Sequence, residues 1–250
     1  TYTNPATFYK ELYDLDITLI DNETTGTSDQ SQPELIRFIT ETQGVIVNSK
    51  QNTLDFITIS STDLSMSGQS VQVTDDPDAE CSSIDVSVDE SIIAVVATKG
   101  SCERGSLYLV DATSLTKYGP YELGYNPDAV DISVDNEYVV VVNEFDYEDG
   151  VDGGCDNLGF PGVSIYDISS GIDKAVLVKD MKISHTGSNG NLAEPEGVKI
   201  APNGTTVYMT LQESNELGWF SINNPPDVLV DKVTFTNPEH EPDGIWVNSD

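Results

Sequence analysis

Short segments in which apolar and polar residues alternate follow one another through most of the chain. In Ile84–Asp89, Ile and Val alternate with Asp and Ser, and residues such as those of Pro202–Gly204 separate one segment from the next. Period-two alternation, β-branched residues and Gly, Asn, Asp or Pro between the segments are typical of β-strands. The pattern therefore predicts an all-β chain, in which only Pro5–Tyr13 is compatible with a short helix.

One of these segments recurs along the sequence at a nearly constant interval. Ile84–Asp89 aligns with four further segments, namely Ile36–Glu41, Val130–Asp135, Val198–Asn203 and Ile245–Asp250. Three of the four spacings are 46 to 48 residues, and the fourth, of 68, contains insertions near 146–162 and 171–190. A repeat of this length indicates a modular fold rather than a single irregular sheet.

Each repeat predicts four strands in the same order. A turn with Pro and an acidic residue opens the unit, and a short alternating strand follows. The second strand is almost wholly apolar, as in Ile92–Ala97, and the third ends in a polar residue, as in Ser106–Asp111. A weaker fourth strand closes the unit, for example Val176–Met181 or Val228–Phe235. Four strands per repeat predict a β-propeller of four-stranded antiparallel blades, whereas a sandwich would not explain the constant repeat.

The repeat also predicts the division of the chain. Blades are expected at 36–83, 84–129, 130–197 and 198–244, and a fifth begins at 245, so the propeller is expected to continue beyond residue 250. Residues 1–35 form an N-terminal segment that could supply a ring-closing strand.

Charge narrows the function classes. The chain has 43 acidic and 11 basic residues, with a net charge of −32. Such a chain is not expected to bind nucleic acid or an anionic membrane surface, and it contains no apolar run long enough to span a bilayer. The Thr-, Ser- and Asn-rich composition and the start at Thr1 favour a mature secreted or cell-surface protein. Two sequons predict glycosylation at Asn22 and Asn203.

Acidic residues in the blade-opening turns form the first candidate site. Asp128, Glu196 and Asp243 each follow Pro at equivalent places in three repeats, so they are expected to lie in an arc around one end of the propeller channel. Carboxylate ligands would select Ca²⁺ or Mg²⁺. The alternative is that Pro and the acid only shape the turn and accept backbone N–H bonds, and the turn signal favours this alternative.

An acidic loop forms the second candidate metal site. Its five carboxylates lie within eleven residues, and glycines between them would allow the loop to wrap around an ion: Asp146, Glu148, Asp149, Asp152 and Asp156. A bound Ca²⁺ would relieve their mutual repulsion, although the spacing is not that of an EF-hand. The alternative is a solvated acidic loop.

The three cysteines are all expected in polar, exposed loops on one face of the propeller. An odd number in a secreted chain favours one disulfide and one remaining thiol. Cys81–Cys102 would link parts of one blade, and Cys102–Cys155 would link two neighbouring blades; the first pairing is the preferred hypothesis.

Few residues favour catalysis. His185 and His240 lie in different repeats, and no nucleophile–base, zinc or phosphate-binding motif is present. Trp219 and Phe220 lie in a predicted third strand, where packing is favoured over sugar binding; glycan binding stays open. These observations favour a non-catalytic structural or binding module. The alternative is a metal-dependent hydrolase of lactonase or phosphoesterase type that uses the carboxylates at the channel mouth.

Longer motifs resemble a known family. Glu194–Asn215 resembles a blade motif of secreted bacterial YVTN-type propellers, and the choice-of-anchor I group is the most similar. Further matching stretches are Pro127–Val130, Tyr138–Glu144, Gly162–Asp167 and Gln43–Ile59, so the resemblance runs from about Glu34 to Asp250. The chain departs from the family pattern at Met209, after Glu144 and in the acidic insertion that contains Cys155.

The resemblance implies a seven-bladed propeller when complete and an extracellular scaffold or binding role. It implies no defined reaction. The partners expected for such a role are other protein chains, remaining segments of the same protein, further copies of it, or glycans.

Overall fold

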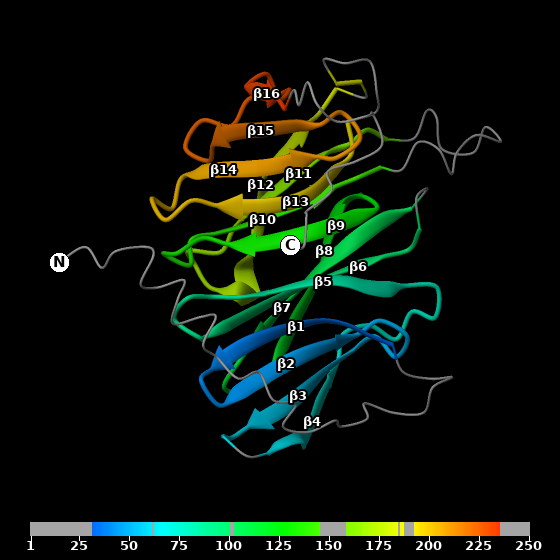
Figure 1. Cartoon of the computed structure of the whole chain (residues 1–250), viewed down its shortest axis with the longest axis vertical. Coiled ribbons are helices and arrows are strands. Elements are labelled where there is room, and N and C mark those ends of the chain that lie inside the picture. Colours follow the sequence, from blue (N-terminus) through cyan, green and yellow to red (C-terminus); the bar gives the residue numbers. More distant parts are fainter. Residues whose placement is uncertain are drawn as a thin grey trace, which may run out of the picture.

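The strands of the protein form four separate antiparallel sheets. The computed structural model describes residues 32–61, 63–100, 103–145, 159–184, 186–187 and 193–235. Each sheet contains four strands that are consecutive in the sequence, and the sheets follow one another from the blue to the orange part of the chain (Figure 1). The prediction of an all-β propeller with four-stranded blades is thereby confirmed.

Each blade is a meander of neighbouring strands. Blade 1 consists of β1 (Pro33–Thr40), β2 (Gln43–Asn48), β3 (Thr53–Ile59) and β4 (Leu64–Gln72). Blade 2 consists of β5 (Glu80–Val86), β6 (Ile92–Thr98), β7 (Arg104–Asp111) and β8 (Lys117–Tyr125). Blade 3 consists of β9 (Pro127–Ile132), β10 (Tyr138–Asn143), β11 (Gly162–Asp167) and β12 (Val176–Lys182), with a 3-10 turn, η2 (Ile172–Lys174), before the last strand. Blade 4 consists of β13 (Pro195–Ile200), β14 (Thr206–Leu211), β15 (Glu216–Ser221) and β16 (Lys232–Thr234).

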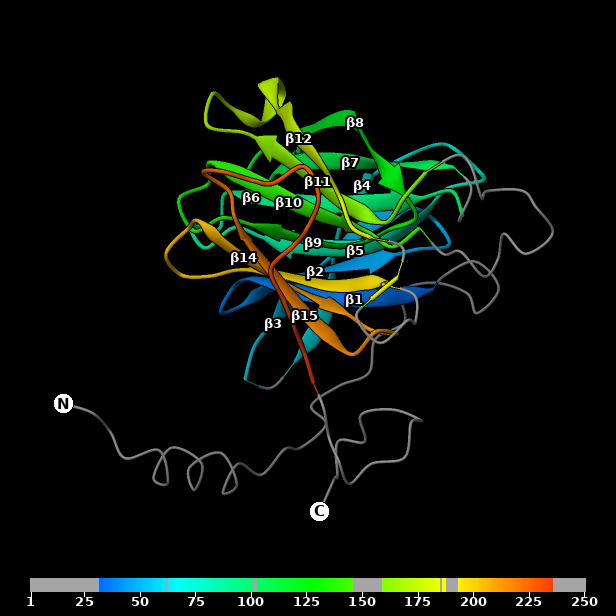
Figure 2. The ribbon, with the colours of Figure 1, turned by 90° about the horizontal axis from the view of Figure 1, so that it is seen from above.

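The first strand of each blade lies nearest the propeller axis. The strand β9 contacts both β5 and β13, and β5 also contacts β1, so the four first strands form successive walls of the channel. Seen from above, these inner strands lie in the middle of the molecule, and the outer strands β8 and β12 lie at one margin (Figure 2).

The observed blades begin slightly before the predicted ones. Their first strands start at Pro33, Glu80, Pro127 and Pro195, three or four residues ahead of the predicted unit boundaries. The offset arises because the aligned segments, such as Ile84–Asp89, begin inside the inner strand and not at its first residue. The expected fifth blade at 245 and the helix at Pro5–Tyr13 lie outside the described residues.

The apolar second strands are buried on both faces. In β6, Ile93 and Val95 pack in a cluster between blades 1 and 2, whereas Ala94 and Val96 pack in a cluster between blades 2 and 3. Successive side chains of a strand point to opposite faces, so a strand placed between two neighbouring blades needs apolar residues at every position. The residues of β10 divide in the same way between the interface of blades 2 and 3 and that of blades 3 and 4.

The two outermost described blades each keep one face that no other described blade covers. On blade 1, Ile36 is 46% and Phe38 is 62% exposed, and on blade 4, Tyr208 is 41% exposed. The described blades therefore form an arc with apolar side chains on its two end faces.

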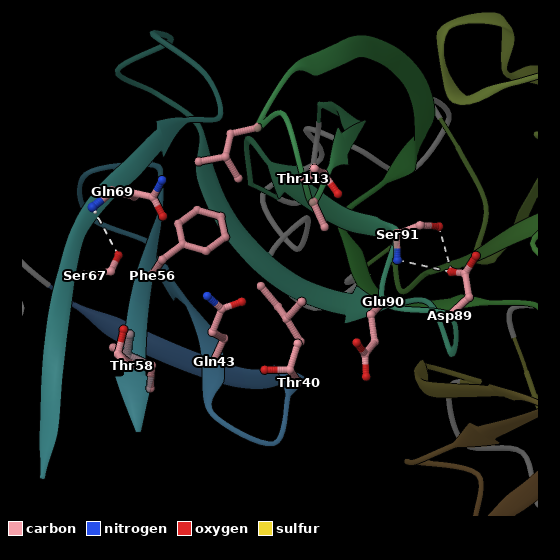
Figure 3. A pocket seen from close by; sticks show the side chains of 14 residues that line it. Thr40, Gln43, Phe56, Thr58, Ser67, Gln69, Asp89, Glu90, Ser91 and Thr113 are labelled. Carbon is pink, nitrogen blue, oxygen red and sulfur yellow. Dashed lines mark hydrogen bonds between the residues drawn. The ribbon is translucent and has the colours of Figure 1, made fainter. Parts of the chain in front are cut away.

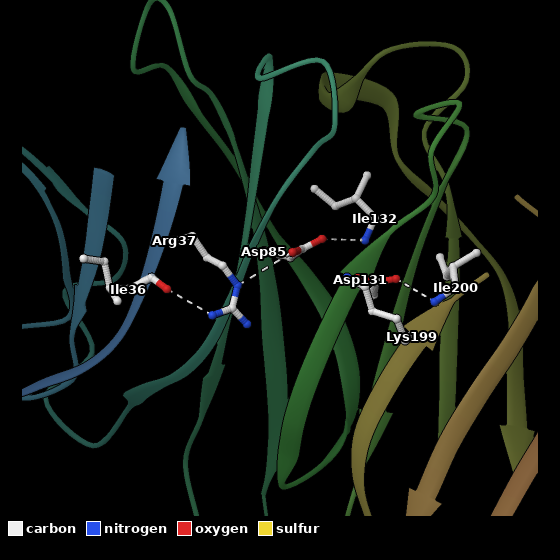
Figure 4. A network of polar contacts seen from close by, with 7 residues as sticks. All are labelled: Ile36, Arg37, Asp85, Asp131, Ile132, Lys199 and Ile200. Atoms are coloured by element: carbon white, nitrogen blue, oxygen red, sulfur yellow. Dashed lines mark hydrogen bonds and ion pairs between the residues drawn. The ribbon is translucent and has the colours of Figure 1, made fainter. Parts of the chain in front are cut away.

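A row of charged residues on the inner strands connects successive blades. We call Arg37, Asp85, Asp131 and Lys199 the charged row, because each occupies the same place in its inner strand. Arg37 Nε lies 3.8 Å from Asp85 Oδ1, and the amide N–H of Ile132 donates to Asp85 Oδ2 at 3.0 Å (Figure 4).

The same contact is repeated between blades 3 and 4. Asp131 is buried, and its Oδ2 accepts the amide N–H of Ile200 at 2.6 Å, while Lys199 Nζ donates to Oδ1. A carboxylate of one blade thus accepts a backbone N–H from the inner strand of the next blade. The apolar clusters stabilise the interfaces between blades, and these hydrogen bonds fix the orientation of one blade relative to the next.

The contact between Asp85 and Ile132 predicts a stability effect. Replacing Asp85 by Ala would leave a buried N–H without its acceptor and should lower the free energy of unfolding by about 1–3 kcal/mol. Urea unfolding followed by circular dichroism would measure the change. Asp85→Asn retains an acceptor oxygen and should lose less, and Asp63→Ala, at an exposed acid, should change stability by no more than about 0.5 kcal/mol. Equal losses for Asp85→Ala and Asp63→Ala would contradict the proposed role.

Candidate functional site

Each inner strand contains a β-bulge at the same place, three residues before the charged row. In β9, for example, Pro127 and Ala129 pair with adjacent residues of β10, and Asp128 is the extra residue. The equivalent extra residues of β1, β5 and β13 are Glu34, Ser82 and Glu196. We call these four residues the bulge row. A bulge bends its strand and re-aims the extra side chain, which is why bulges recur beside functional sites.

The bulge row brings two of the predicted site residues together. Asp128 and Glu196 come from neighbouring blades, and their carboxyl groups lie close enough to share a hydrogen bond when Asp128 is protonated. Burial, the Glu196 charge and this hydrogen bond raise the pKa of Asp128 to about 6. At neutral pH the two groups therefore hold negative charge in close contact at one end of the channel, an arrangement that either a proton or a cation stabilises.

The other two members of the bulge row differ from this pair. Glu34 is exposed, and its Oε1 accepts from Gln32 Nε2 at 2.8 Å. Ser82 Oγ donates to the carbonyl oxygen of Pro127 at 2.9 Å and so connects blades 2 and 3 beside Asp128. Acidic residues thus occupy three of the four positions of the row.

Sequence reasoning missed Glu34 and the charged row. The dipeptide Pro33-Glu34 matches Pro127-Asp128 and Pro195-Glu196, so the repeated Pro–acid pair was available as a signal. The charged row was visible as well, because its members occupy the second position of the aligned repeat segments.

The complete metal sites predicted from the sequence are not formed by the described residues. Asp243 lies outside them, and so do all five carboxylates of the acidic loop between residues 146 and 156. Within the described part of the chain, no group of three or more His, Cys, Asp or Glu side chains could hold a metal ion. Of the predicted ligands, the described residues bring together only the two carboxyl groups of Asp128 and Glu196. Binding of Ca²⁺ stays a prediction.

Cys81 lies in a different environment from the one predicted. It is a free thiol in β5, fully buried in the cluster between blades 1 and 2, and burial raises its pKa to about 12. The expectation of an exposed loop was wrong for this residue, because the inner strand begins at Glu80, before the cysteine. Cys102 and Cys155 lie outside the described residues, so the disulfide pairing stays a prediction.

The remaining candidates are placed as follows. Asn203 is exposed in a turn, and its Oδ1 accepts the amide N–H groups of Thr205 and Thr206 at 3.0 Å. Glycosylation at Asn203 stays a prediction. Phe220 packs in the cluster between blades 3 and 4, and Trp219 is half-buried beside it, as predicted for a packed strand. Asn22, His185 and His240 lie outside the described residues. The described residues contain no helix whose length and apolar character would let it cross a membrane.

Three solved structures illustrate what the fold resembles. A protein of unknown function from Desulfotomaculum acetoxidans DSM 771 has a TM-score of 0.58 at 12% identity, over 81% of this chain and 56% of that one. A putative 6-phosphogluconolactonase from Bacteroides fragilis NCTC 9343 has a TM-score of 0.56 at 12% identity, over 85% and 62%. The periplasmic gluconolactonase PpgL of Pseudomonas aeruginosa has a TM-score of 0.52 at 13% identity, over 88% and 61%.

At such low identity these likenesses show the fold alone, and the chain spans less than two thirds of the length of each of these structures. A comparison with curated proteins finds no match. The sequence does match the family model of the choice-of-anchor I domain, over residues 34–226. The match runs from β1 to beyond β15, so of the sixteen described strands only β16 lies outside it. It confirms the resemblance found in the motifs. The chain therefore belongs to the choice-of-anchor I domain family.

Proposed function

We propose that this propeller is a non-catalytic binding or structural module of a secreted or cell-surface protein, and that its acidic channel mouth binds Ca²⁺. Membership of the choice-of-anchor I family supports the extracellular setting. The observation that carries the ion-binding part is the contact between the Asp128 and Glu196 carboxyl groups, which two β-bulges bring together from neighbouring blades.

Ca²⁺ is the preferred ion because of the chemistry of the donor set. Ca²⁺ takes oxygen ligands in flexible numbers and accepts water in the remaining positions, so two protein carboxylates are a sufficient anchor for weak binding. Burial and the Glu196 charge both disfavour the ionised form of Asp128, and a divalent cation would offset the repulsion between the two carboxylates. Extracellular Ca²⁺ modules bind with a Kd of about 0.1–1 mM, and an open two-carboxylate site belongs in this range.

A lactone hydrolase is the second candidate function. A carboxyl group with a raised pKa beside a second carboxylate is a pattern found in acid–base catalysis, and Asp128 beside Glu196 has that pattern. Two of the structures with a similar fold are named as a gluconolactonase and a putative 6-phosphogluconolactonase. The binding role is preferred because the sequence offers no nucleophile–base motif.

Calcium should stabilise the protein through the paired carboxylates. With a Kd of about 0.1–1 mM, 10 mM Ca²⁺ should raise the free energy of unfolding by about 1.4–2.7 kcal/mol at neutral pH. Thermal unfolding with Ca²⁺ and with a chelator, together with calorimetric titration, would measure the effect. Asp128→Asn and Glu196→Gln should each remove most of it.

Glu34→Gln is the matched control, since Glu34 occupies the same bulge position without the paired carboxyl group. It should retain the Ca²⁺ effect. If Ca²⁺ stabilises the Asp128→Asn protein as much as the wild type, the ion binds elsewhere and the mouth site is rejected; the acidic loop would then be the site to test.

Proton binding gives a separate prediction in the presence of chelator. The pKa of Asp128 is about 6 in the folded protein and about 3.9 in an unfolded chain, so the folded state binds more protons between these values. The Asp128 contribution therefore lowers stability as pH rises from about 4 through 6.

Asp128→Asn lacks this titration and should gain thermal stability relative to the wild type as pH rises across that window, with a constant gain above it. Burial also raises the pKa of Asp131 to about 6, so only the difference between variant and wild type isolates Asp128. A difference that does not change with pH would contradict the assignment.

The two candidate functions make opposite predictions for turnover. The binding module should hydrolyse no member of a panel of sugar lactones and phosphoesters, with or without Ca²⁺ or Mg²⁺. Turnover that Asp128→Asn or Glu196→Gln abolishes, while Glu34→Gln retains it, would replace the binding role by the hydrolase.

A further inference from the structure

A cavity lies between blades 1 and 2, at the ends of the inner strands opposite the bulge row. Its volume is about 540 Å³, a size suited to a ligand, and residues from both blades line it. Ile39 and Phe56 are apolar residues of its lining, and the amide side chains of Gln43 and Gln69 lie on either side of the Phe56 ring (Figure 3). The cavity thus combines an apolar surface with groups that can hydrogen-bond a peptide backbone.

A second hollow adjoins this cavity. The two hollows share Ile39, Thr40 and Glu90, and the second adds Glu41 and Val88. Val88 is 73% exposed there. We call these two adjoining hollows together the blade 1–2 groove. Two adjoining hollows can receive successive side chains of an extended peptide.

Every charged side chain among the described residues that line the blade 1–2 groove is acidic. These residues are Glu41, Asp89 and Glu90. Asp89 is engaged within its own turn, where Ser87 Oγ and Ser91 Oγ both donate to Oδ1 at 2.7 Å, and these bonds together with one from Asn136 lower its pKa. Glu90, by contrast, is exposed at the rim, where the two hollows meet.

Glu90 departs from the equivalent turns of the other blades. All three turns need a residue with a left-handed backbone, and blades 3 and 4 have Asn136 (φ 58°) and Gly204 (φ 74°), which adopt it readily. Blade 2 has Glu90 at φ 65°, a residue that this conformation disfavours. The Glu90 carboxylate is thus presented at the rim of the cavity from a turn whose backbone would be better suited to Gly or Asn.

From these observations we infer that the blade 1–2 groove binds a basic, amphipathic peptide segment of a partner protein. Apolar side chains of the segment pack on Ile39, Phe56 and Val88, and lysine or arginine side chains pair with Glu90 and Glu41. Charge complementarity selects this occupant, because an acidic peptide would meet only like charges in the groove. The groove is separate from the carboxylate pair at the channel mouth, so either site can fail its test alone.

Fluorescence anisotropy with labelled peptides tests the inference in the intact chain at physiological salt. A lysine–leucine peptide should bind, whereas a glutamate–leucine peptide of the same length should not. Glu90→Gln should weaken binding of the lysine–leucine peptide about fivefold, as expected for one partly desolvated ion pair. Glu90→Gly should weaken it equally while raising the melting temperature, since glycine suits the turn and has no carboxylate.

Two controls separate the groove from general attraction to an acidic protein. Glu137→Gln removes one exposed carboxylate from the equivalent turn of blade 3 and should leave the affinity unchanged. Val88→Ser should weaken binding of the lysine–leucine peptide but not that of a lysine–serine peptide of equal charge.

Three results would overturn the inference. The first is the absence of binding by the lysine–leucine peptide, and the second is an equal loss of affinity in Glu90→Gln and Glu137→Gln. The third is binding of a neutral oligosaccharide such as cellohexaose that depends on Glu90, which would assign the groove to glycans instead.

Discussion

The free edges of the inner strands β9 and β13 need acceptors for their amide groups, and the preceding blade supplies them. Ser133 and Ala201 donate their N–H groups within their own blades, so the alternate amides of Ile132 and Ile200 point away from those partners. Asp85 and Asp131 of the preceding blades accept them. Because an unpaired buried N–H is costly, the bond that satisfies the edge also fixes the position of the next blade.

This register determines what gathers at the channel mouth. The bulge row lies three residues before the charged row in every described blade, so aligning one row aligns the other. Asp128 and Glu196 are consequently brought together although their charges repel, and burial together with the Glu196 charge raises the pKa of Asp128. The apolar clusters between the blades provide the stability that holds the two groups in place.

The sequence predicted the parts of the fold that depend on repetition. Two-sided burial leaves the continuous apolar pattern seen in Ile92–Ala97, and the period of the repeat follows from four short strands, so the blades were predictable. The bulges were not, since a single extra residue in a strand leaves no pattern of its own; only the repeated Pro–acid dipeptide marks three of them. The burial of Cys81 was missed for a related reason: a residue near a turn signal can already belong to the inner strand.

Ser82 is the one member of the bulge row that is not acidic, and the charges next to it explain this difference. Ser82 occupies the position held by Glu34, Asp128 and Glu196 in the other blades, and its hydroxyl donates to the carbonyl of the residue that precedes Asp128. An acid at position 82 would lie next to a carboxyl pair that already resists full ionisation, and it could not donate this hydrogen bond when ionised. A neutral donor lets blade 2 bond to blade 3 without adding charge there. The break in the acidic row thus keeps a third carboxylate away from the pair formed by Asp128 and Glu196.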